Sequence, residues 1–506
     1  MRPTVVRLAT ITALALATTL TACAPSGTIA GITSVTINGG DRTLTTGDTT
    51  TLTATVVATG GASQTITWTS SNPSVATIDT SGNVLALTEG TTTITATSTT
   101  DPTKNDTITL TVDAPGMLRW TRQFGTDNSD EAAGIATDPI GNVYIVGYTS
   151  GALTGSNAGS DDGFIRSYDQ HGNHRWTRQF GTTSSDRAYG VATDTNGNVY
   201  TVGNTFGALE GSNAGSVDVF IRAYDQNGNH RWTRQFGTSS YDLATGIATD
   251  TNGNVYTSGY TNGALEGSNV GGFDAFIRSY DQDGNHRWTR QFGTSSGDIA
   301  TGIASDTNGN VYTSGYTNGA LEGSNAGNAD AFIRSYDQNG NHRWTRQFGT
   351  ISFDFVNGIA SDTNGNVYTA GRTNGALEGS SAGSDDAFIR SYDQDGNHRW
   401  TRQFGTSSND YSTGVASDTN GNVYAAGRTD GDLEDSNAGG GYAFIRAYNQ
   451  DGNHRWTRQF GTSSNDYSTG VASDTNGNVY AAGYTNRDLD GSNAGDNDAF
   501  IRSHGR

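Results

Sequence analysis

Apolar and polar residues alternate along most of this chain, in short runs that Gly, Asn, Asp and Ser separate. Asn254–Tyr260, Ala275–Tyr280 and His286–Phe292 are three successive runs of this kind. A period of two that is rich in Val, Ile, Thr and aromatic residues indicates half-buried β-strands. The connection Asp283-Gly284 favours a tight hairpin, because Gly tolerates the positive φ that such turns need. The pattern therefore predicts an all-β protein.

The alternating pattern recurs every 56 residues over the last three quarters of the chain. Near-copies of one WTRQFGT motif begin at Trp120, Trp176, Trp232, Trp288, Trp344, Trp400 and Trp456. Each unit holds four predicted strands, here named a to d, and such repetition is typical of a propeller or a solenoid. The array starts with a lone strand d, Leu118–Phe124, and ends with a strand c, Ala499–Ser503. Because these two ends complete one blade, we expect residues 118–506 to form a closed seven-bladed β-propeller.

A second alternating region precedes the repeats. Within residues 32–113, runs such as Thr65–Thr69 and Thr107–Val112 predict about seven short strands and a β-sandwich. Trp68 is the expected anchor of its core. The segments Trp68–Asp79, Gly82–Val84 and Gly90–Ala96 resemble the bacterial Ig-like domain of group 2. That resemblance implies a spacer or adhesion module without catalytic residues, which residues 114–117 would link to the repeats.

The repeat unit also resembles the bacterial β-propeller repeat called SBBP. The matching residues in one copy are Asp242, Asp250–Gly259, Asp274–Arg278, Gly284 and Trp288. This copy departs from the family pattern at Arg278, where Lys is common, and at Phe292-Gly293, where Gly-Gly is common. The resemblance implies the propeller fold and a bacterial location rather than an activity.

The N-terminus predicts export and lipid anchoring. Arg2 and Arg7 precede an apolar stretch, Leu8–Leu20, that is too short to be a mature membrane span. Leu20-Thr21-Ala22-Cys23 then resembles a bacterial lipobox, and Cys23 is the only cysteine of the chain. We expect residues 1–22 to be a lipoprotein signal peptide, Cys23 to be lipidated and residues 23–31 to be a tether. An ordinary secretion signal is the alternative interpretation.

Composition and charge narrow the function. A formal net charge of −20 argues against nucleic acid as a partner. No Ser/His/Asp order, zinc motif, phosphate loop or dinucleotide fingerprint occurs, so we do not expect an enzyme. The hypothesis is a monomeric, lipid-anchored surface protein whose propeller binds an extracellular protein or glycan, and which meets the membrane only through its anchor. The alternatives are a polysaccharide lyase or hydrolase acting at the propeller centre, and a purely structural envelope protein.

Sequence differences among the copies point to one face of the propeller. Hairpins should place the a–b and c–d turns on one face, the turn face, and the longer b–c and d–a loops on the other, the loop face. Loops on a rigid scaffold commonly carry binding residues, and aromatic residues are frequent interface anchors. The candidate binding residues are Glu131, Arg187, Tyr241, Leu243, Ile299, Phe353, Phe355, Tyr411 and Tyr467. Drift in unconstrained loops would produce the same variation.

One aspartate recurs in every copy just before strand a. These residues are Asp130, Asp186, Asp242, Asp298, Asp354, Asp410 and Asp466. They could bind a cation, but capping of backbone N–H groups in their own turns is the favoured role. Asp281 and Asp283 in one c–d turn are a weaker Ca²⁺ candidate, against which a plain hairpin turn is favoured. No cofactor is expected, and Ca²⁺ is possible but not favoured.

Overall fold

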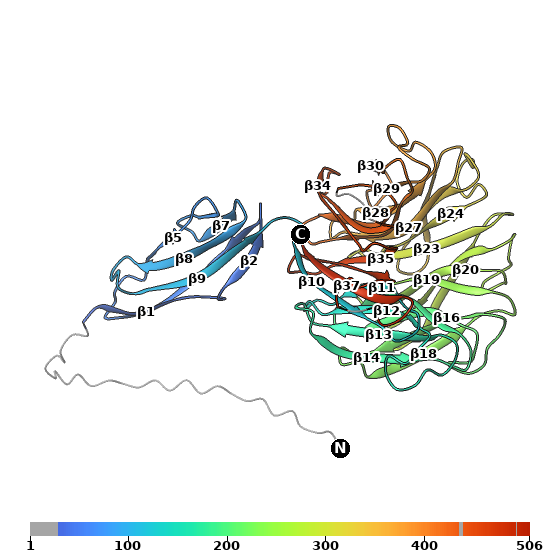
Figure 1. Cartoon of the computed structure of the whole chain (residues 1–506), viewed down its shortest axis with the longest axis horizontal. Helices are drawn as coiled ribbons and strands as arrows, with labels where there is room; N and C mark the ends of the chain where they lie inside the picture. Colours follow the sequence, from blue (N-terminus) through green and yellow to red (C-terminus); the bar gives the residue numbers. More distant parts are fainter. Residues whose placement is uncertain (1–28, 435–438, 492) are drawn as a thin grey trace, which may run out of the picture. The chain divides into compact units, whose positions relative to one another are not determined.

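The computed structural model describes residues 29–434, 439–491 and 493–506. The predicted signal peptide and Cys23 lie outside the described residues, as does most of the tether. Every described element is a β-strand (Figure 1). The chain divides into two compact units, and the sequence boundary between them falls after Asp113. The all-β prediction is confirmed.

The first unit is an Ig-like arrangement of nine short strands. They are β1 (Gly31–Ile37), β2 (Arg42–Thr45), β3 (Thr49–Thr51), β4 (Ala54–Thr59), β5 (Ile66–Ser70), β6 (Ala76–Ile78), β7 (Asn83–Ala86), β8 (Gly90–Ser98) and β9 (Asn105–Asp113). The sheets have the orders β2-β9-β8-β5, β3-β7-β6 and β1-β4. Ile94, Leu110 and Val84 are almost fully buried in the core. Trp68 packs half-buried against that core instead of at its centre.

The second unit is the propeller, with four strands in each of seven sheets. Blade 1 is β11 (Asp130–Thr137), β12 (Val143–Thr149), β13 (Asp162–Tyr168) and β14 (His174–Phe180); blade 2 is β15 (Asp186–Thr193), β16 (Val199–Thr205), β17 (Asp218–Tyr224) and β18 (His230–Phe236). Blade 3 is β19 (Asp242–Thr249), β20 (Val255–Thr261), β21 (Asp274–Tyr280) and β22 (His286–Phe292); blade 4 is β23 (Asp298–Ser305), β24 (Val311–Thr317), β25 (Asp330–Tyr336) and β26 (His342–Phe348). Blade 5 is β27 (Asp354–Ser361), β28 (Val367–Thr373), β29 (Asp386–Tyr392) and β30 (His398–Phe404); blade 6 is β31 (Asp410–Ser417), β32 (Val423–Thr429), β33 (Tyr442–Tyr448) and β34 (His454–Phe460).

Blade 7 joins the two ends of the propeller. Its sheet has the order β10-β37-β36-β35, formed by β35 (Asp466–Ser473), β36 (Asn478–Thr485), β37 (Asp498–Gly505) and β10 (Leu118–Phe124). In Figure 1 the early strand β10 lies beside the red final strand β37, and the two pair antiparallel, with Phe124 opposite Ala499. Blade 7 also meets blade 1, because Thr469 Oγ1 donates a 2.9 Å hydrogen bond to the carbonyl of Ala132. The predicted closure by an N-terminal outer strand is confirmed.

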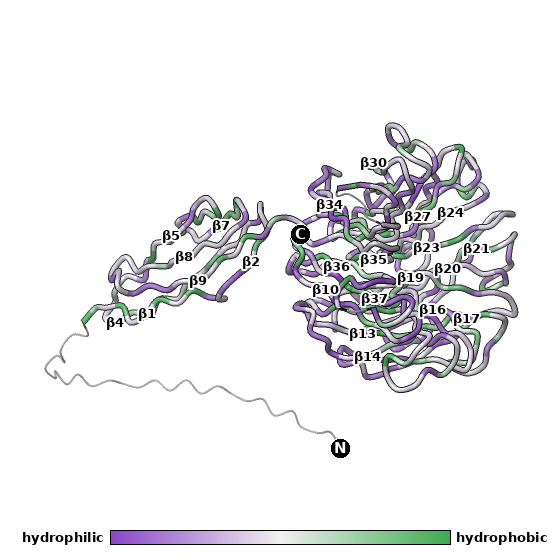
Figure 2. Tube along the Cα trace, in the orientation of Figure 1, coloured by the Kyte–Doolittle hydropathy of each residue, from purple (hydrophilic) through white to green (hydrophobic). Residues whose placement is uncertain are grey.

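Alternating side chains of neighbouring blades make the core. Tyr256, Ile277 and Trp288 of blade 3 pack with Ile303 and Tyr336 of blade 4, and each junction repeats this layer with small changes. In Figure 2, short hydrophobic stretches of the strands lie between hydrophilic ones. Burial of aromatic and branched side chains between blades is the dominant stabilising term, because a single blade exposes both faces.

Residues 114–117, expected as a linker, lie in the second unit and replace the missing c–d turn of blade 7. The N–H of Met117 donates to the carbonyl of Ala114 at 3.1 Å. Arg458 Nε donates to the carbonyl of Gly116 at 3.1 Å, as its counterparts in other blades do to the turn glycines. A Cβ on Gly116 would lie 2.8 Å from the ring of Trp456. The repeat pattern does not predict this turn, because the residues that form it lie at opposite ends of the repeat array in the sequence.

His504 sits beside this turn, where the other six c strands carry Tyr. Its Nδ1 lies 2.9 Å from the carbonyl oxygen of Gly116. Burial, aided by the guanidinium groups of Arg502 and Arg458, lowers the pKa of His504 to about 3. The imidazole is therefore neutral at ordinary pH, and its Nδ1–H donates to Gly116.

Candidate functional site

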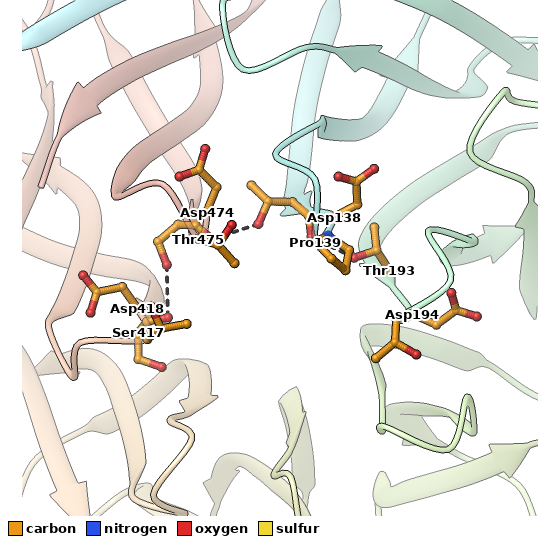
Figure 3. A pocket seen from close by; sticks show the side chains of 12 residues that line it. Asp138, Pro139, Thr193, Asp194, Ser417, Asp418, Asp474 and Thr475 are labelled. Atoms are coloured by element: carbon orange, nitrogen blue, oxygen red, sulfur yellow. Dashed lines mark hydrogen bonds between the residues drawn. The ribbon is translucent and has the colours of Figure 1, made fainter. Parts of the chain in front are cut away.

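The turn face is a scaffold of self-contained hairpins. Asp138 Oδ1 accepts hydrogen bonds from the N–H groups of Ile140 and Asn142, and its Oδ2 accepts from Asn142 Nδ2 and from the hydroxyl of Tyr144. Equivalent aspartates do the same in the other blades, which explains why these turns hardly vary. An open hollow of about 300 Å³ lies among them, but the carboxylates of Asp138, Asp194, Asp418 and Asp474 point away from it (Figure 3).

The candidate calcium turn is another such hairpin. Asp281 accepts hydrogen bonds from the N–H groups of Asp283 and Asn285 and from Asn285 Nδ2, at 2.8 to 3.0 Å. Asp283 lies 3.7 Å from the guanidinium of Arg231. The two carboxylates are thus used within the turn and against a neighbouring arginine, which gives them no shared ligand position.

The conspicuous WTRQF motif joins blades together. Trp288 Nε1 donates to the carbonyl of Gln338 at 3.0 Å, and Arg290 Nε donates to that of Gly340 at 2.7 Å. The guanidinium carbon of Arg290 also lies 5.6 Å from the Trp288 ring centroid. Gln291 accepts from the N–H of Leu265 and donates to Asp274, which fastens the b–c loop of its own blade. The motif therefore builds the scaffold that carries the loop face.

The middle of the propeller is narrow and lined by small or apolar groups. Its cavity has a volume of about 150 Å³, and the described residues that line it are Gly, Ala, Ile, Val and Thr from the strands a. Thr245 Oγ1 donates to the carbonyl of Ala300 in the next blade at 2.9 Å. This lining supplies no nucleophile–base pair of the kind that hydrolysis or elimination requires.

The seven recurrent aspartates are buried inside the loop face. Asp242 Oδ2 accepts from the N–H and the hydroxyl of Thr238 at 2.6 and 2.8 Å, and the other copies make the same pair of bonds. All seven are fully buried. Burial raises the pKa of Asp298 and Asp410 above its usual range. They hold the d–a loops in shape and do not form a solvent-exposed ring.

The variable loop residues meet across blade junctions. At four junctions the second residue of strand a contacts the penultimate residue of strand b in the preceding blade. The rings of Tyr316 and Phe355 make an edge-to-face contact at 4.6 Å. The guanidinium carbon of Arg372 lies 5.0 Å from the ring of Tyr411 and that of Arg428 lies 4.4 Å from the ring of Tyr467. We name this set the central ring: Glu131, Tyr148, Arg187, Asn204, Leu243, Tyr260, Ile299, Tyr316, Phe355, Arg372, Tyr411, Arg428, Tyr467 and Tyr484.

The charged members of the central ring have partners. Arg187 contacts Asp161 at 2.6 Å and stacks on Tyr148. Arg428 contacts Asp430 at 2.7 Å. The hydroxyl of Tyr148 donates to Glu131, and burial together with this bond raises the pKa of that phenol well above its ordinary value. Since neighbouring carboxylates such as Asp161 and Asp430 compensate the arginines of the ring, the half-exposed surface that it presents is mainly aromatic.

Two of the candidate binding residues lie outside the central ring and are largely exposed, although Phe353 also stacks on Phe355. Tyr241 is 50% exposed and Phe353 is 43% exposed, each immediately before a strand a. The prediction missed further apolar loop residues: Phe206, Val270 and Ile351 are 50%, 58% and 86% exposed. Comparison of the copies could have found Phe206 and Ile351, because other copies carry mostly polar residues there. We name these five residues, which belong to the loops of blades 2 to 5, the apolar rim.

The described part of the chain lacks two further features. It contains no helix long and apolar enough to cross a membrane. Nor do its His, Cys, Asp and Glu side chains gather in groups of three or more that could hold a metal ion.

Family comparisons agree with this architecture. Residues 31–110 match the bacterial Ig-like domain of group 2. Seven segments match the β-propeller repeat named SBBP: 119–153, 175–209, 231–266, 287–322, 343–378, 399–434 and 455–490. This chain is an SBBP propeller protein with a bacterial Ig-like domain. Ig-like domains of this group are typical of bacterial extracellular proteins.

Individual relatives of the SBBP protein are distant. The regulatory protein FlaEY of Caulobacter vibrioides is 27% identical over 191 residues, which cover 33% of this chain and 20% of the relative. An uncharacterised WD-repeat protein of Acanthamoeba polyphaga mimivirus is 23% identical over 207 residues, covering 33% of this chain and 15% of that one. The chain thus matches at most a fifth of either relative's length. Among solved structures, Sqt1 from Chaetomium thermophilum aligns with a TM-score of 0.41 at 12% identity, covering 73% of this chain and 82% of its own.

Proposed function

We propose that this SBBP protein is a lipid-anchored, extracytoplasmic binding protein whose propeller recognises a partner through the loop face. The observation that carries the proposal is the exposure of the apolar rim on the same face that carries the half-exposed aromatic ring. Tyr241, Phe353 and Ile351 are large apolar side chains at least two-fifths exposed on loops that a rigid scaffold holds. Exposed large apolar side chains on one face are frequent in interaction sites.

A protein is the partner that this surface suits best. Sugars stack on flat aromatic faces, whereas the apolar rim also carries the aliphatic Val270 and Ile351. Arg187 and Arg428 already contact Asp161 and Asp430, so an anionic partner would have to displace those carboxylates. An uncharged, apolar segment of a protein would instead bury the rim directly.

Site-specific photo-crosslinking in cells that make the full chain tests the proposal. A photoreactive amino acid at position 353 should yield a discrete crosslinked protein. The matched control is position 140 on the turn face, where Ile140 is also apolar and is 69% exposed. Equal products from both positions, or products from 140 alone, would contradict binding through the loop face. A product that disappears after periodate treatment would show a glycan in place of a protein.

The anchor is tested separately. Cys23 supports the proposal because it is the only cysteine and follows Leu20-Thr21-Ala22. Cells grown with labelled fatty acid should label the wild-type chain and fail to label the Cys23→Ser variant. Labelling of both forms, or of neither, would refute the anchor while leaving the crosslinking result intact.

A further inference from the structure

A second set of aspartates faces the recurrent ones across every junction but one. Asp162 begins β13 of blade 1 and Asp186 begins β15 of blade 2, with Gly181 of the connecting loop between them. A Cβ on Gly181 would lie 2.1 Å from Asp162 Oδ1 and 3.3 Å from Asp186 Oδ2. The six pairs are Asp162/Asp186, Asp218/Asp242, Asp274/Asp298, Asp330/Asp354, Asp386/Asp410 and Asp498/Asp130.

These carboxylates are buried and incompletely bonded. Asp162 and Asp218 are 1% exposed, and Asp186 and Asp498 are 0% exposed. In each pair, one Oδ2 accepts from backbone and Gln groups and the other from a Thr. The Oδ1 atoms of Asp130, Asp162, Asp186, Asp218, Asp274, Asp330, Asp410 and Asp498 have no hydrogen-bond partner in the described structure, and neither has that of Asp466 at the remaining junction. The Oδ1 atoms of Asp242, Asp298 and Asp354 accept from Thr261, Thr317 and Thr373, and that of Asp386 accepts from the N–H of Gly383.

Hydrogen-bond donors contact the Oδ2 atoms, but no cationic side chain of the described residues forms an ion pair with these carboxylates. None of the ion pairs found among the described residues includes a member of the six pairs. Burial of an unpaired carboxylate is costly, and two adjacent ones repel each other, so such groups take up a proton or bind a cation. Burial, and then the neighbouring Asp274, raise the pKa of Asp298.

We propose that each of these six junctions binds one Ca²⁺ ion between its two aspartates. Ca²⁺ is a hard cation that takes carboxylate, carbonyl and water oxygens in flexible geometry. Two carboxylates neutralise its charge, and the remaining ligands come from such neutral oxygens. The residue beside both carboxylates is a glycine at all six sites, and a Cβ there would lie only 2.1 to 2.6 Å from a carboxylate oxygen: Gly125, Gly181, Gly237, Gly293, Gly349 and Gly405.

The seventh junction is a control that the chain itself supplies. Tyr442 begins β33 of blade 6, where the other strands c begin with Asp. A Cβ on Gly461 would lie 2.8 Å from Tyr442 Cδ1 and 2.7 Å from Asp466 Oδ2. One carboxylate is therefore present where the other junctions have two. This junction lacks the charge to hold a divalent cation, so the chain binds six ions and not seven.

Calcium titration of the full chain tests the proposal. The purified chain is stripped with chelator, titrated with CaCl₂ in a calorimeter, and melted with and without Ca²⁺. We expect about six ions per chain and a melting temperature that rises with Ca²⁺, because a ligand of the folded state stabilises it. Asp186→Asn, which keeps an oxygen for Thr182, should bind one ion fewer, and Tyr442→Asp should bind one more. Asp281→Asn, in a turn outside the junctions, should bind the same number.

The proposal would be overturned if the titration showed no heat of calcium binding and Ca²⁺ did not change the melting temperature. So would an unchanged stoichiometry in Asp186→Asn together with Tyr442→Asp. If Asp186→Asn instead raised the melting temperature in chelator and Ca²⁺ had no effect on either form, the pairs would share a proton, and the calcium sites would be refuted. The apolar rim takes no part in this test, so its outcome is independent of the proposed function.

Discussion

The hydroxyl of Thr137 donates a 2.8 Å hydrogen bond to the backbone carbonyl of Ser473, which joins the first blade to the last. The same bond recurs at every junction, where the final residue of one strand a donates to the final residue of the preceding one. The others run from Thr193 to Thr137, Thr249 to Thr193, Ser305 to Thr249, Ser361 to Ser305, Ser417 to Ser361 and Ser473 to Ser417, at 2.7 to 3.0 Å. Together they form a closed ring of seven bonds at the turn face.

Removal of one member should weaken the propeller by the value of one hydrogen bond. Thr137→Val at the closure and Thr249→Val at an interior junction each keep the side-chain shape. Each should lower the free energy of unfolding by about 0.5–1.5 kcal/mol, measured by urea denaturation. The control Thr251→Val, in an exposed turn, should change it by less than about 0.5 kcal/mol. If Thr137→Val were as stable as the wild type, the hydrogen bond at the closure would contribute nothing to the free energy of unfolding.

Acid should lower the stability of the propeller through protonation of His504 in the unfolded state. The folded state keeps its pKa at about 3, while the unfolded chain protonates near its ordinary value of 6.5. Below pH 6.5 the unfolded state therefore binds the extra proton, and stability falls as pH drops toward 3, by up to about 1.4 kcal/mol per pH unit. Above pH 6.5 this contribution is fully present.

The His504→Tyr variant isolates this effect, because Tyr fills the same position in six other blades. The stability difference between wild type and variant, measured by urea denaturation from pH 7.5 to 4, should widen in favour of the variant as pH falls. Titration of the aspartates affects both forms and cancels. A difference that is flat across this range would contradict the buried, neutral histidine.

A methyl group on Gly116 should damage the closing turn by more than its backbone conformation alone explains. Gly116 has φ +70° and faces Trp456, whereas Gly155 has φ +74° and open space around it. Gly155→Ala should cost about 1–2 kcal/mol for the left-handed backbone. Gly116→Ala should cost a further 1–3 kcal/mol or so for overpacking. Thermal unfolding that ranks the two variants equally would mean that the turn shifts freely away from Trp456.

Different residues of the loop face should affect partner binding and folding stability. Tyr241→Ser changes an exposed side chain, so it should alter the unfolding free energy by less than about 0.5 kcal/mol while weakening partner binding about tenfold or more. Phe355→Ala removes a ring packed on Tyr316 and Phe353, and should cost about 1–3 kcal/mol of stability. Paired denaturation and crosslinking measurements check both. Unchanged crosslinking in Tyr241→Ser would exclude Tyr241 from the interface.

Sequence alone determined the architecture because the alternating pattern and its period are local and repeated. Asn254–Tyr260, Ala275–Tyr280 and His286–Phe292 agree with β20, β21 and β22 to within one residue. The lone strand at Leu118–Phe124 pairs with the final strand, as its offset in the repeat requires. The repeat pattern did not predict the turn at 114–117, because this segment pairs with residue 505 at the other end of the chain.

Only the tertiary structure decided which side chains meet. Period-two alternation tells which face of its own sheet a residue occupies, but the partner on that face comes from the next blade. Tyr316 and Phe355 touch across 39 positions of sequence, and Asp162 reaches Asp186 from a different strand of a different blade. Variable positions that looked like free loop residues, such as Arg187, are therefore packed, and buried carboxylates that looked like single turn caps stand in pairs. Such contacts depend on the angle between neighbouring sheets, which no local pattern encodes.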